Sequence, residues 1–429
     1  MKRIIYYFSL LIFLISCKRM VEEEIAVIWT DKVEVASYCE LFNASQNKYR
    51  IIVEYKENPA DEILKKEAKA DIVIASFLKG NATLGKFSSL DYLLRGDIDA
   101  TLFYEELLSL GNIDGVQYLL PVSFNLPTII FSISNGHLLE DNFLVSFEDL
   151  KKLSSQLNKK KKDSYTKMSF APRWEADLLY MAMQGMDVDF EEDRKKDDSK
   201  DTYKESNVRG LFKWNEENLK RAIEYLKAWS KDANENSQFE DEFKFKYLYD
   251  VPYLSVSNGF CSFYYMPTER LFSIAKDKME NLDFRYLDFD GKVPCKDDIL
   301  YAAIMASSKN KKASEAFFVW FYSPSVQQQL LMQKIDENVF TKEFGIAGGF
   351  SSLKPITEKA FPKYYPLLLS HLPPTKALKT PRILPNNWKL LKEEILYPYL
   401  LDATYYIESD NNMSSISLKD RILTWIDKN

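Results

Sequence analysis

The fold is decided by the stretch at residues 25–75, IAVIWTDKVEVASYCELFNASQNKYRIIVEYKENPADEILKKEAKADIVIA. Residues 25–29, 50–55 and 71–75 are apolar runs of strand length, and residues 33–43 have the apolar spacing of a helix. Asn58 and Pro59 are typical of a helix start and predict a second helix, which we expect to extend to about Lys69. Alternating strands and helices indicate a parallel sheet, and such sheets bind ligands beyond the carboxyl ends of their strands.

The rest of the chain continues in mixed α/β style. Further strands are predicted at residues 129–133, 259–265, 283–289 and 299–305, and further helices at 146–157, 172–184, 309–322 and 326–334, with another starting after Asn215. Residues 187–205 hold nine acidic and five basic side chains, so we interpret them as an exposed insertion whose removal would cost little stability.

The N-terminus has the pattern of an export signal. Lys2 and Arg3 precede the apolar run Ile4–Ile15, which is too short to span a bilayer. Ser16 and Cys17 follow, and a small residue before a cysteine at this place resembles a bacterial lipobox. The resemblance implies cleavage before Cys17 and lipid on its thiol, with residues 1–16 as signal peptide and 17–21 as a lipidated tether. A plain signal peptide with a chance cysteine is the alternative.

Composition argues against several kinds of chemistry. The chain of 429 residues contains 14% aromatic residues and has a formal charge of −6. Because a protein that binds a phosphate backbone normally has an excess of basic residues, such a binder is not expected. Only His137 and His371 are present, which disfavours a catalytic zinc site, and we interpret both as ordinary surface or loop residues. Residues 80–86, GNATLGK, match the glycine and lysine positions of a P-loop, but Phe87 stands where Mg²⁺ needs a hydroxyl.

No catalytic group, cofactor or metal site is predicted from the sequence. Glu175 and Asp177 lie two positions apart on a predicted helix, so they cannot flank one bond as a glycosidase pair does. Removal of the signal leaves Cys39, Cys261 and Cys295. We expect Cys39 to be a core residue, because it shares a helix face with Val35 and Phe42. A disulfide between Cys261 and Cys295 is left open.

The order of motifs resembles the maltose-binding-protein-like family of extracellular solute-binding proteins, the capture components of ABC importers. Individual motifs are short, and their order along residues 22–429 carries the likeness. Two departures are the bulky side chains after Gly259 and the charged segment 187–205. The matching segments are Ile25–Trp29, Asp71–Ala75, Phe87–Asp91, Gly115–Pro121, Ser146–Leu150, the strand after Gly259, and Ala303–Gln327.

This resemblance implies an α/β, two-lobe periplasmic-binding-protein fold of type II, with an interlobe cleft and hinge crossovers. Lobe boundaries are expected at 22–131 plus 301–348 for the first lobe and 132–300 plus 349–429 for the second, with crossovers near Phe131, Leu300 and Gly348. The implied protein is a lipid-anchored monomer whose soluble part lies in the periplasm or outside the cell. Its implied partners are a small solute, ABC permease subunits and the membrane, without nucleic acid.

We expect a carbohydrate ligand in the cleft, because aromatic rings suit the apolar faces of sugars and polar side chains suit their hydroxyls. Tyr264 and Tyr265 alternate along a strand, so only one of them can face the cleft. Two other functions stay open: a surface lipoprotein for interaction or sensing without transport, and an extracellular hydrolase. The expected platforms are Trp29, Phe77, Phe124, Trp174, Tyr264 and Tyr265, and the expected hydrogen-bond partners are Asp31, Asn125 and Glu175.

Overall fold

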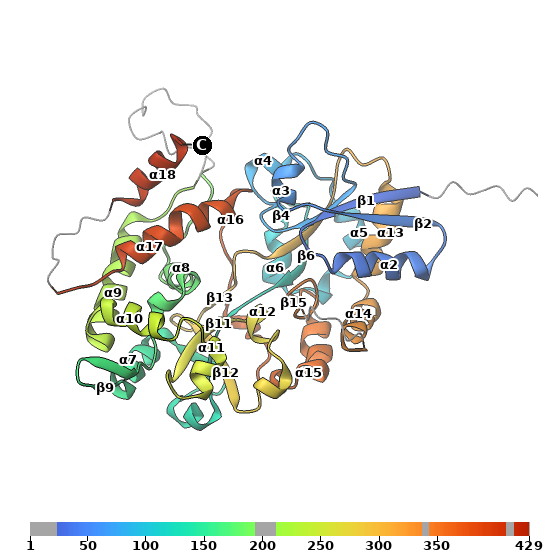
Figure 1. Ribbon diagram of the computed structural model, residues 1–429. Coiled ribbons are helices and arrows are strands. Elements are labelled where there is room, and N and C mark those ends of the chain that lie inside the picture. Colours follow the sequence, from blue (N-terminus) through green and yellow to red (C-terminus); the bar gives the residue numbers. More distant parts are fainter. Residues whose placement is uncertain (1–23, 194–211, 337–342, 409–415, 429) are drawn as a thin grey trace, which may run out of the picture.

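The computed structural model describes residues 24–193, 212–336, 343–408 and 416–428. It contains two principal β-sheets, each flanked by helices, which form the two lobes seen side by side in Figure 1. Lobe one is the part built on the six-stranded sheet, and lobe two is the part built on the four-stranded sheet. The predicted two-lobe α/β fold is therefore confirmed. Within the described ranges, no helix is long and apolar enough to cross a membrane.

The sheet of lobe one contains the strands that the sequence singled out. β1 pairs in parallel with β2 and with β3, which confirms the predicted strand–helix–strand unit. Strands from later in the chain extend the sheet in antiparallel fashion. In sheet order they are β15 (Phe350–Ser351), β6 (Leu120–Phe124), β14 (Leu300–Ile304), β3 (Ile72–Ala75), β1 (Glu24–Thr30) and β2 (Tyr49–Tyr55).

Helices of lobe one bury regular apolar faces against this sheet. In α2, Val35, Cys39 and Phe42 are buried at helical spacing, so the prediction for Cys39 is confirmed. The helix after Pro59 is shorter than predicted and ends at Glu62, because residues 65–67 are charged and exposed and give a longer helix nothing to pack. The helices are α2 (Val35–Ser45), α3 (Pro59–Glu62), α4 (Asn81–Leu84), α5 (Asp91–Arg95), α6 (Glu105–Leu110), α13 (Lys311–Phe321), α14 (Pro324–Asp336) and α15 (Phe361–Tyr364).

Lobe two has a smaller sheet and longer helices. Side chains of Ser146 and Asn215 accept hydrogen bonds from backbone N–H groups three residues later, so both predicted helix starts are confirmed. The strands in sheet order are β11 (Phe263–Pro267), β7 (Pro127–Ser132), β12 (Leu282–Asp288) and β8 (Leu144–Ser146). The helices are α7 (Phe147–Leu157), α8 (Ala176–Gly185), α9 (Glu216–Asn234), α10 (Ser237–Lys246), α11 (Pro252–Ser257), α12 (Thr268–Leu271), α16 (Trp388–Leu391), α17 (Tyr397–Ala403) and α18 (Leu418–Ile426).

Three short pairs of strands lie outside the two principal sheets. Lys159–Lys161 form one strand of a hairpin, and their side chains are exposed. The pairs are β4 (Asn112–Ile113) with β5 (Val116–Gln117), β9 (Lys159–Lys161) with β10 (Ser164–Lys167), and β13 (Val293–Pro294) with β16 (Leu378–Lys379).

The strand pairing corrects two of the expected lobe boundaries. All of β7 lies in the sheet of lobe two, so the chain first crosses after Phe124 rather than near Phe131. The second crossing lies before β14, which starts at Leu300. β15 still pairs with β6, so residues 350–351 belong to the sheet of lobe one, although 349–429 were assigned to lobe two. Both shifts follow from backbone pairing between distant segments, which sequence motifs do not show.

Asn125 links the first two crossing segments to each other and to lobe one. Its Nδ2 donates to the carbonyl of Gly348 at 2.9 Å, and its Oδ1 accepts from Thr268 Oγ1 at 2.8 Å. Its backbone carbonyl accepts from the N–H of Lys296 at 3.0 Å. Asn125 was expected to contact ligand, and the structure places it instead at the hinge between the lobes.

The beginning of the charged segment is part of the core, which corrects the expectation of a wholly exposed insertion. Val188 and Phe190 are buried, and the Phe190 ring stacks on Tyr180 with centroids 5.8 Å apart. Deleting residues 187–205 would therefore remove core side chains and destabilise lobe two. Residues 194–205 lie outside the described ranges, as do the predicted signal peptide and Cys17.

The cysteine pair left open by the sequence is not formed. Cys261 and Cys295 are both free and buried. Cys261 lies just before β11, and the N–H of Cys295 donates to the carbonyl of Lys379 in β16, so each thiol is held in its own packed environment. Burial raises the pKa of both thiols to about 12 and keeps them protonated.

The lobes also meet at an edge away from the hinge. The N–H of Asn81, at the start of α4, donates to the carboxylate of Glu192 at 2.8 and 3.1 Å. Asn386, just before α16, donates to Asp61 of α3. Figure 1 shows α16 beside α3 and α4 at the top of the molecule, whereas α12 and α15 lie at the bottom. In the segment 80–86, which resembles a P-loop, a backbone N–H therefore binds a carboxylate of the other lobe.

Candidate ligand-binding cavity

A cavity of about 870 Å³ lies between the lobes on the side of α12 and α15. This volume lies in the range of sites that enclose small organic ligands. On lobe one, Val33 and Glu34 line the cavity from just before α2, and Ser37 lines it from within α2. Glu343 lies at the same end of the cavity. Lobe two contributes Ile133 and side chains from residues 271–283. The segment 364–371, which begins at the last residue of α15, supplies the remaining wall. The cavity is thus shared by both lobes.

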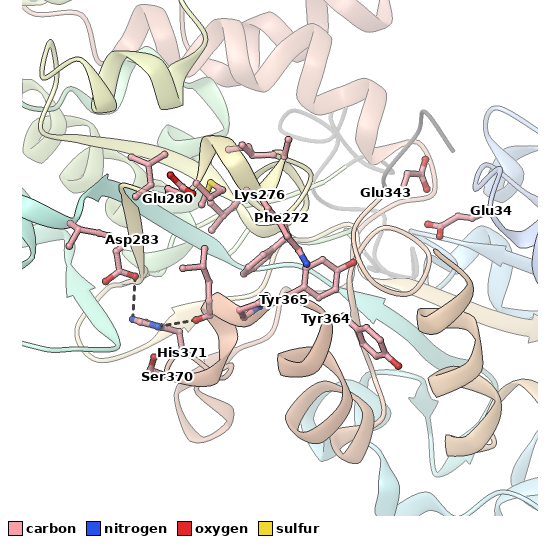
Figure 2. Close-up of a pocket in the computed structure, with 18 of the residues that line it drawn as sticks. Glu34, Phe272, Lys276, Glu280, Asp283, Glu343, Tyr364, Tyr365, Ser370 and His371 are labelled. Atoms are coloured by element: carbon pink, nitrogen blue, oxygen red, sulfur yellow. Dashed lines mark hydrogen bonds and ion pairs between the residues drawn. The ribbon is translucent and has the colours of Figure 1, made fainter. Parts of the chain in front are cut away.

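Aromatic rings form a fixed wall in the middle of the cavity. Phe272 stacks on Phe344 with centroids 4.7 Å apart, and Tyr365 meets Phe272 edge-on at 5.6 Å. The Tyr365 hydroxyl accepts from the N–H of Gly345 at 2.9 Å, and burial raises its pKa to about 12. Figure 2 shows Phe272 and Tyr365 between two groups of acidic side chains. These rings are held by neighbours, so they can receive a ligand face without rearrangement.

At the lobe-two end, Asp283 is balanced by neighbouring nitrogen atoms. Its Oδ2 accepts from Arg285 at 2.8 Å, and Arg285 also donates to Nε2 of His371 at 2.8 Å. Burial lowers the pKa of His371, which leaves the ring neutral at pH 7 and directs its Nδ1–H to the carbonyl of Leu367, 3.2 Å away. His371 lies in a loop, one of the two places expected for it, but its side chain is buried and not at the surface. His137 is exposed, as expected.

At the lobe-one end, several carboxylates lie around Lys32. Lys32 lies beside Asp31, with their charged atoms 3.8 Å apart. Burial opposes the charge on Lys32, but the carboxylates of Asp31, Asp298, Glu343 and Glu34 together raise its pKa. Glu34 and Glu343 belong to the cavity wall. Figure 2 places these two side chains together, opposite Asp283 and His371.

None of the nine residues expected to bind ligand is among those that line this cavity. Asp31 acts on the same part of the molecule, since it is one of the carboxylates that raise the pKa of Lys32 together with Glu34 and Glu343 of the cavity wall. Trp29 is buried: its Nε1 donates to Glu54 at 2.9 Å and the Lys56 ammonium lies 4.6 Å from its ring. Phe124 packs in the core of lobe one against Tyr104.

Three of the expected residues lie together in lobe two. The Trp174 ring stacks on Tyr264 at 5.7 Å and on Phe243 at 5.6 Å, so both of its faces have neighbours. The Tyr264 hydroxyl donates to Glu175 at 2.7 Å. Tyr265 points the other way and is buried, which agrees with the predicted alternation.

The remaining expected residue, Phe77, lies where the lobes touch. It follows β3 with a φ of 59°, packs against buried side chains of lobe two, and lies 5.9 Å from the ammonium of Lys392. The carboxyl end of β3 therefore does face the other lobe, as the parallel-sheet rule predicts.

Glu175 and Asp177 have separate partners. Glu175 binds Tyr264 and Arg270, whereas Asp177 binds Lys296 and Tyr265. Among residues 24–193, 212–336, 343–408 and 416–428, no group of three or more His, Cys, Asp or Glu side chains could hold a metal ion.

Comparison with solved structures identifies the fold of the chain. No family model matches the chain, and no curated protein sequence matches it. Solved structures do match it over nearly its whole length, and they are two-lobe binding proteins of the maltose-binding type. The chain has the fold of that class.

Three of the similar structures illustrate the relationship. One is the cyclic α-maltosyl-1,6-maltose binding protein from Arthrobacter globiformis, with 15% identity, a TM-score of 0.59, and coverage of 93% of this chain and 96% of that one. Another is the maltose-binding periplasmic protein MalE from Listeria monocytogenes in complex with maltose, with 15% identity, a TM-score of 0.57 and coverage of 95% and 98%. The third is the sugar-binding protein MalE from Xanthomonas citri, with 13% identity, a TM-score of 0.59 and coverage of 94% and 96%. At such identities the likeness establishes the fold.

Proposed function

We propose that this protein captures a carbohydrate in the interlobe cavity and delivers it to the permease of an ABC importer. The observation that carries the proposal is that one cavity is lined by side chains of both lobes. A ligand bound there contacts both lobes at once, so binding and hinge closure are coupled. The similar structures are named as binding proteins for maltose and related sugars, which agrees with capture rather than catalysis.

The chemistry of the wall suits a sugar. Phe272 and Tyr365 offer flat apolar surfaces for the faces of pyranose rings. Carboxylates accept hydrogen bonds from hydroxyl groups, and Glu34 and Glu343 lie at one end of the same cavity. The volume of about 870 Å³ can hold an oligosaccharide of a few rings.

A thermal-shift screen of oligosaccharides, followed by calorimetry, tests the proposal. Phe272→Ala is expected to weaken binding roughly thirtyfold, about 2 kcal/mol, because truncation of a central aromatic anchor has effects of this size. Phe245→Ala is the matched control, since this ring is 76% exposed and lies outside the cavity. Equal affinity of both variants and the parent protein would contradict this placement. Absence of any carbohydrate ligand would favour the interaction or sensing alternative.

The proposal includes a lipid anchor on Cys17, which the export signal in the sequence supports. Cys17→Ser is expected to abolish lipidation and to move the protein from the detergent phase to the aqueous phase in Triton X-114 partition, since acyl chains provide the membrane affinity. Unchanged partition of the variant would show that Cys17 carries no anchor.

A further inference from the structure

We infer that the solute combines a sugar with an aliphatic chain, as an alkyl- or acyl-substituted oligosaccharide does, and that the chain lies at the lobe-two end of the cavity. This inference rests on the proposed function and specifies the class of solute. It follows from the kind of apolar side chain that lines this end and from the bonding of the polar groups beside it.

The apolar wall at the lobe-two end is aliphatic rather than aromatic. The backbone N–H of Ile133 donates to the carbonyl of Asn281 at 3.0 Å, and the N–H of Leu282 donates to the carbonyl of Met279 at 3.0 Å. Leu282 also pairs with Ser132 between β12 and β7, so Ile133 and Leu282 are held near one another. The aliphatic residues of lobe two that line the cavity are Ile133, Leu271, Ile274, Ala275, Met279 and Leu282.

Ile133 is the clearest sign of an apolar ligand group. Its side chain lines the cavity and is 58% exposed. Five other aliphatic residues of lobe two line the same cavity, so Ile133 is not an isolated apolar residue on an open surface. A ligand that removes such a side chain from water gains free energy in proportion to the apolar area covered. An aliphatic chain provides this cover, whereas a sugar hydroxyl does not.

The buried polar groups at this end already have partners in the protein. Asp283 accepts from Arg285 through Oδ2 and from the N–H of Phe284 through Oδ1, both at 2.8 Å. His371 lies between the carbonyl of Leu367 and Arg285, at 3.2 and 2.8 Å from its two ring nitrogen atoms. Sugar hydroxyls placed here would compete with these bonds. An aliphatic chain makes no such demand, so it leaves the bonds intact.

The sugar part of the solute then lies against the aromatic rings in the middle of the cavity. Phe272 and Tyr365 are next to the aliphatic wall, as Figure 2 shows for the rings and Asp283. Lys276 and Glu280 also line the cavity, but both side chains are exposed, so their charges are hydrated. The volume of about 870 Å³ is large enough for a small oligosaccharide together with a chain.

Calorimetry with maltose, n-hexyl β-maltoside and n-octyl β-maltoside tests the inference, at concentrations at which no micelles form. Octyl maltoside is expected to bind about tenfold more tightly than hexyl maltoside, because it buries two more methylene groups. Hexyl maltoside is in turn expected to bind more tightly than maltose. The heat-capacity change of binding should become more negative along the same series, since it reports burial of apolar surface. 1-Octanol, which lacks the sugar, should bind at least about tenfold more weakly than octyl maltoside.

A variant of the aliphatic wall shows whether this gain comes from the lobe-two end. Ile133→Ser should weaken binding of octyl maltoside about fivefold and change binding of maltose less than twofold. Ile52→Ser is the matched control, since Ile52 is 44% exposed on β2 and does not line the cavity. Equal effects of the two substitutions on octyl maltoside would overturn the placement of the chain.

The affinities of the parent protein separate the inference from the proposed function. Equal affinity for octyl maltoside and maltose would overturn the inference and leave the proposed function standing. Octanol that binds as tightly as octyl maltoside would overturn both, because the sugar would then contribute nothing. Absence of binding by every sugar and glycoside tested would also overturn both.

Discussion

Lys296→Met is expected to lower the free energy of unfolding by about 3–5 kcal/mol, since removal of one partner leaves a buried charge without compensation. Lys296 is 8% exposed, and its ammonium lies 2.7 Å from Asp177 and 3.9 Å from Glu269. Burial is the largest effect and would raise the pKa of Asp177, but the charges of Lys296 and Lys392 and the hydrogen bonds from Lys296 and Tyr265 together hold that pKa well below its usual range. The pair joins a crossing segment of the hinge to α8 of lobe two.

Urea unfolding followed by tryptophan fluorescence measures this loss. The double variant Lys296→Met, Asp177→Asn should recover part of the stability, because the neutral amide no longer needs a buried cation. Lys65→Met is the control, since Lys65 forms an exposed pair with Glu62 at 2.6 Å and should cost less than about 0.5 kcal/mol. A loss at Lys296 as small as that at Lys65 would show that the buried pair contributes little.

Glu240→Gln is expected to remove a large pH dependence of stability. Glu240 is fully buried in α10, and burial raises its pKa to about 7 from 4.5. Hydrogen bonds from Asn234 at 2.7 Å and Ser230 at 3.1 Å oppose this shift, as does Arg173. Arg173 approaches no closer than 3.5 Å and also binds Thr404, so it compensates the carboxylate only in part.

The direction of this pH dependence follows from the difference in the pKa of Glu240 between the folded and the unfolded state. Between pH 4.5 and 7 the unfolded chain loses the Glu240 proton while the folded protein keeps it, so the folded state becomes less stable as pH rises. The stability of the parent protein minus that of Glu240→Gln should therefore fall by about 3 kcal/mol from pH 5 to pH 8. Glu242→Gln, an exposed change on the same helix, should show a nearly constant difference. A constant difference for Glu240→Gln as well would contradict the elevated pKa.

Local patterns predicted the elements of the fold well. In residues 25–75, strand-length apolar runs and the helical spacing of Val35, Cys39 and Phe42 correspond to β1, α2, β2 and β3. These features depend on residues close in sequence, so they can be read without knowledge of the rest of the chain. The two-lobe architecture was predicted from the order of the motifs along the chain, through its resemblance to a known family.

The candidate site was harder to predict because it depends on how the lobes sit together. Residues 271–283 and 364–371 carry no motif, and they become a wall only where they face Glu34 and Glu343. Trp29 ends a strand at the predicted edge, but β1 has a strand on each side and its tryptophan turns to Glu54 of β2. Glu34 could have been predicted from the sequence, since it lies three residues after Asp31 at that same edge of the sheet.

A crystal structure of the protein with a bound oligosaccharide tests the central claim most directly. We expect electron density for sugar rings in the interlobe cavity, in contact with Phe272 and Tyr365, with one end beside Glu34 and Glu343. Density for the ligand against Trp29 and Trp174, with the interlobe cavity holding only solvent, would contradict it.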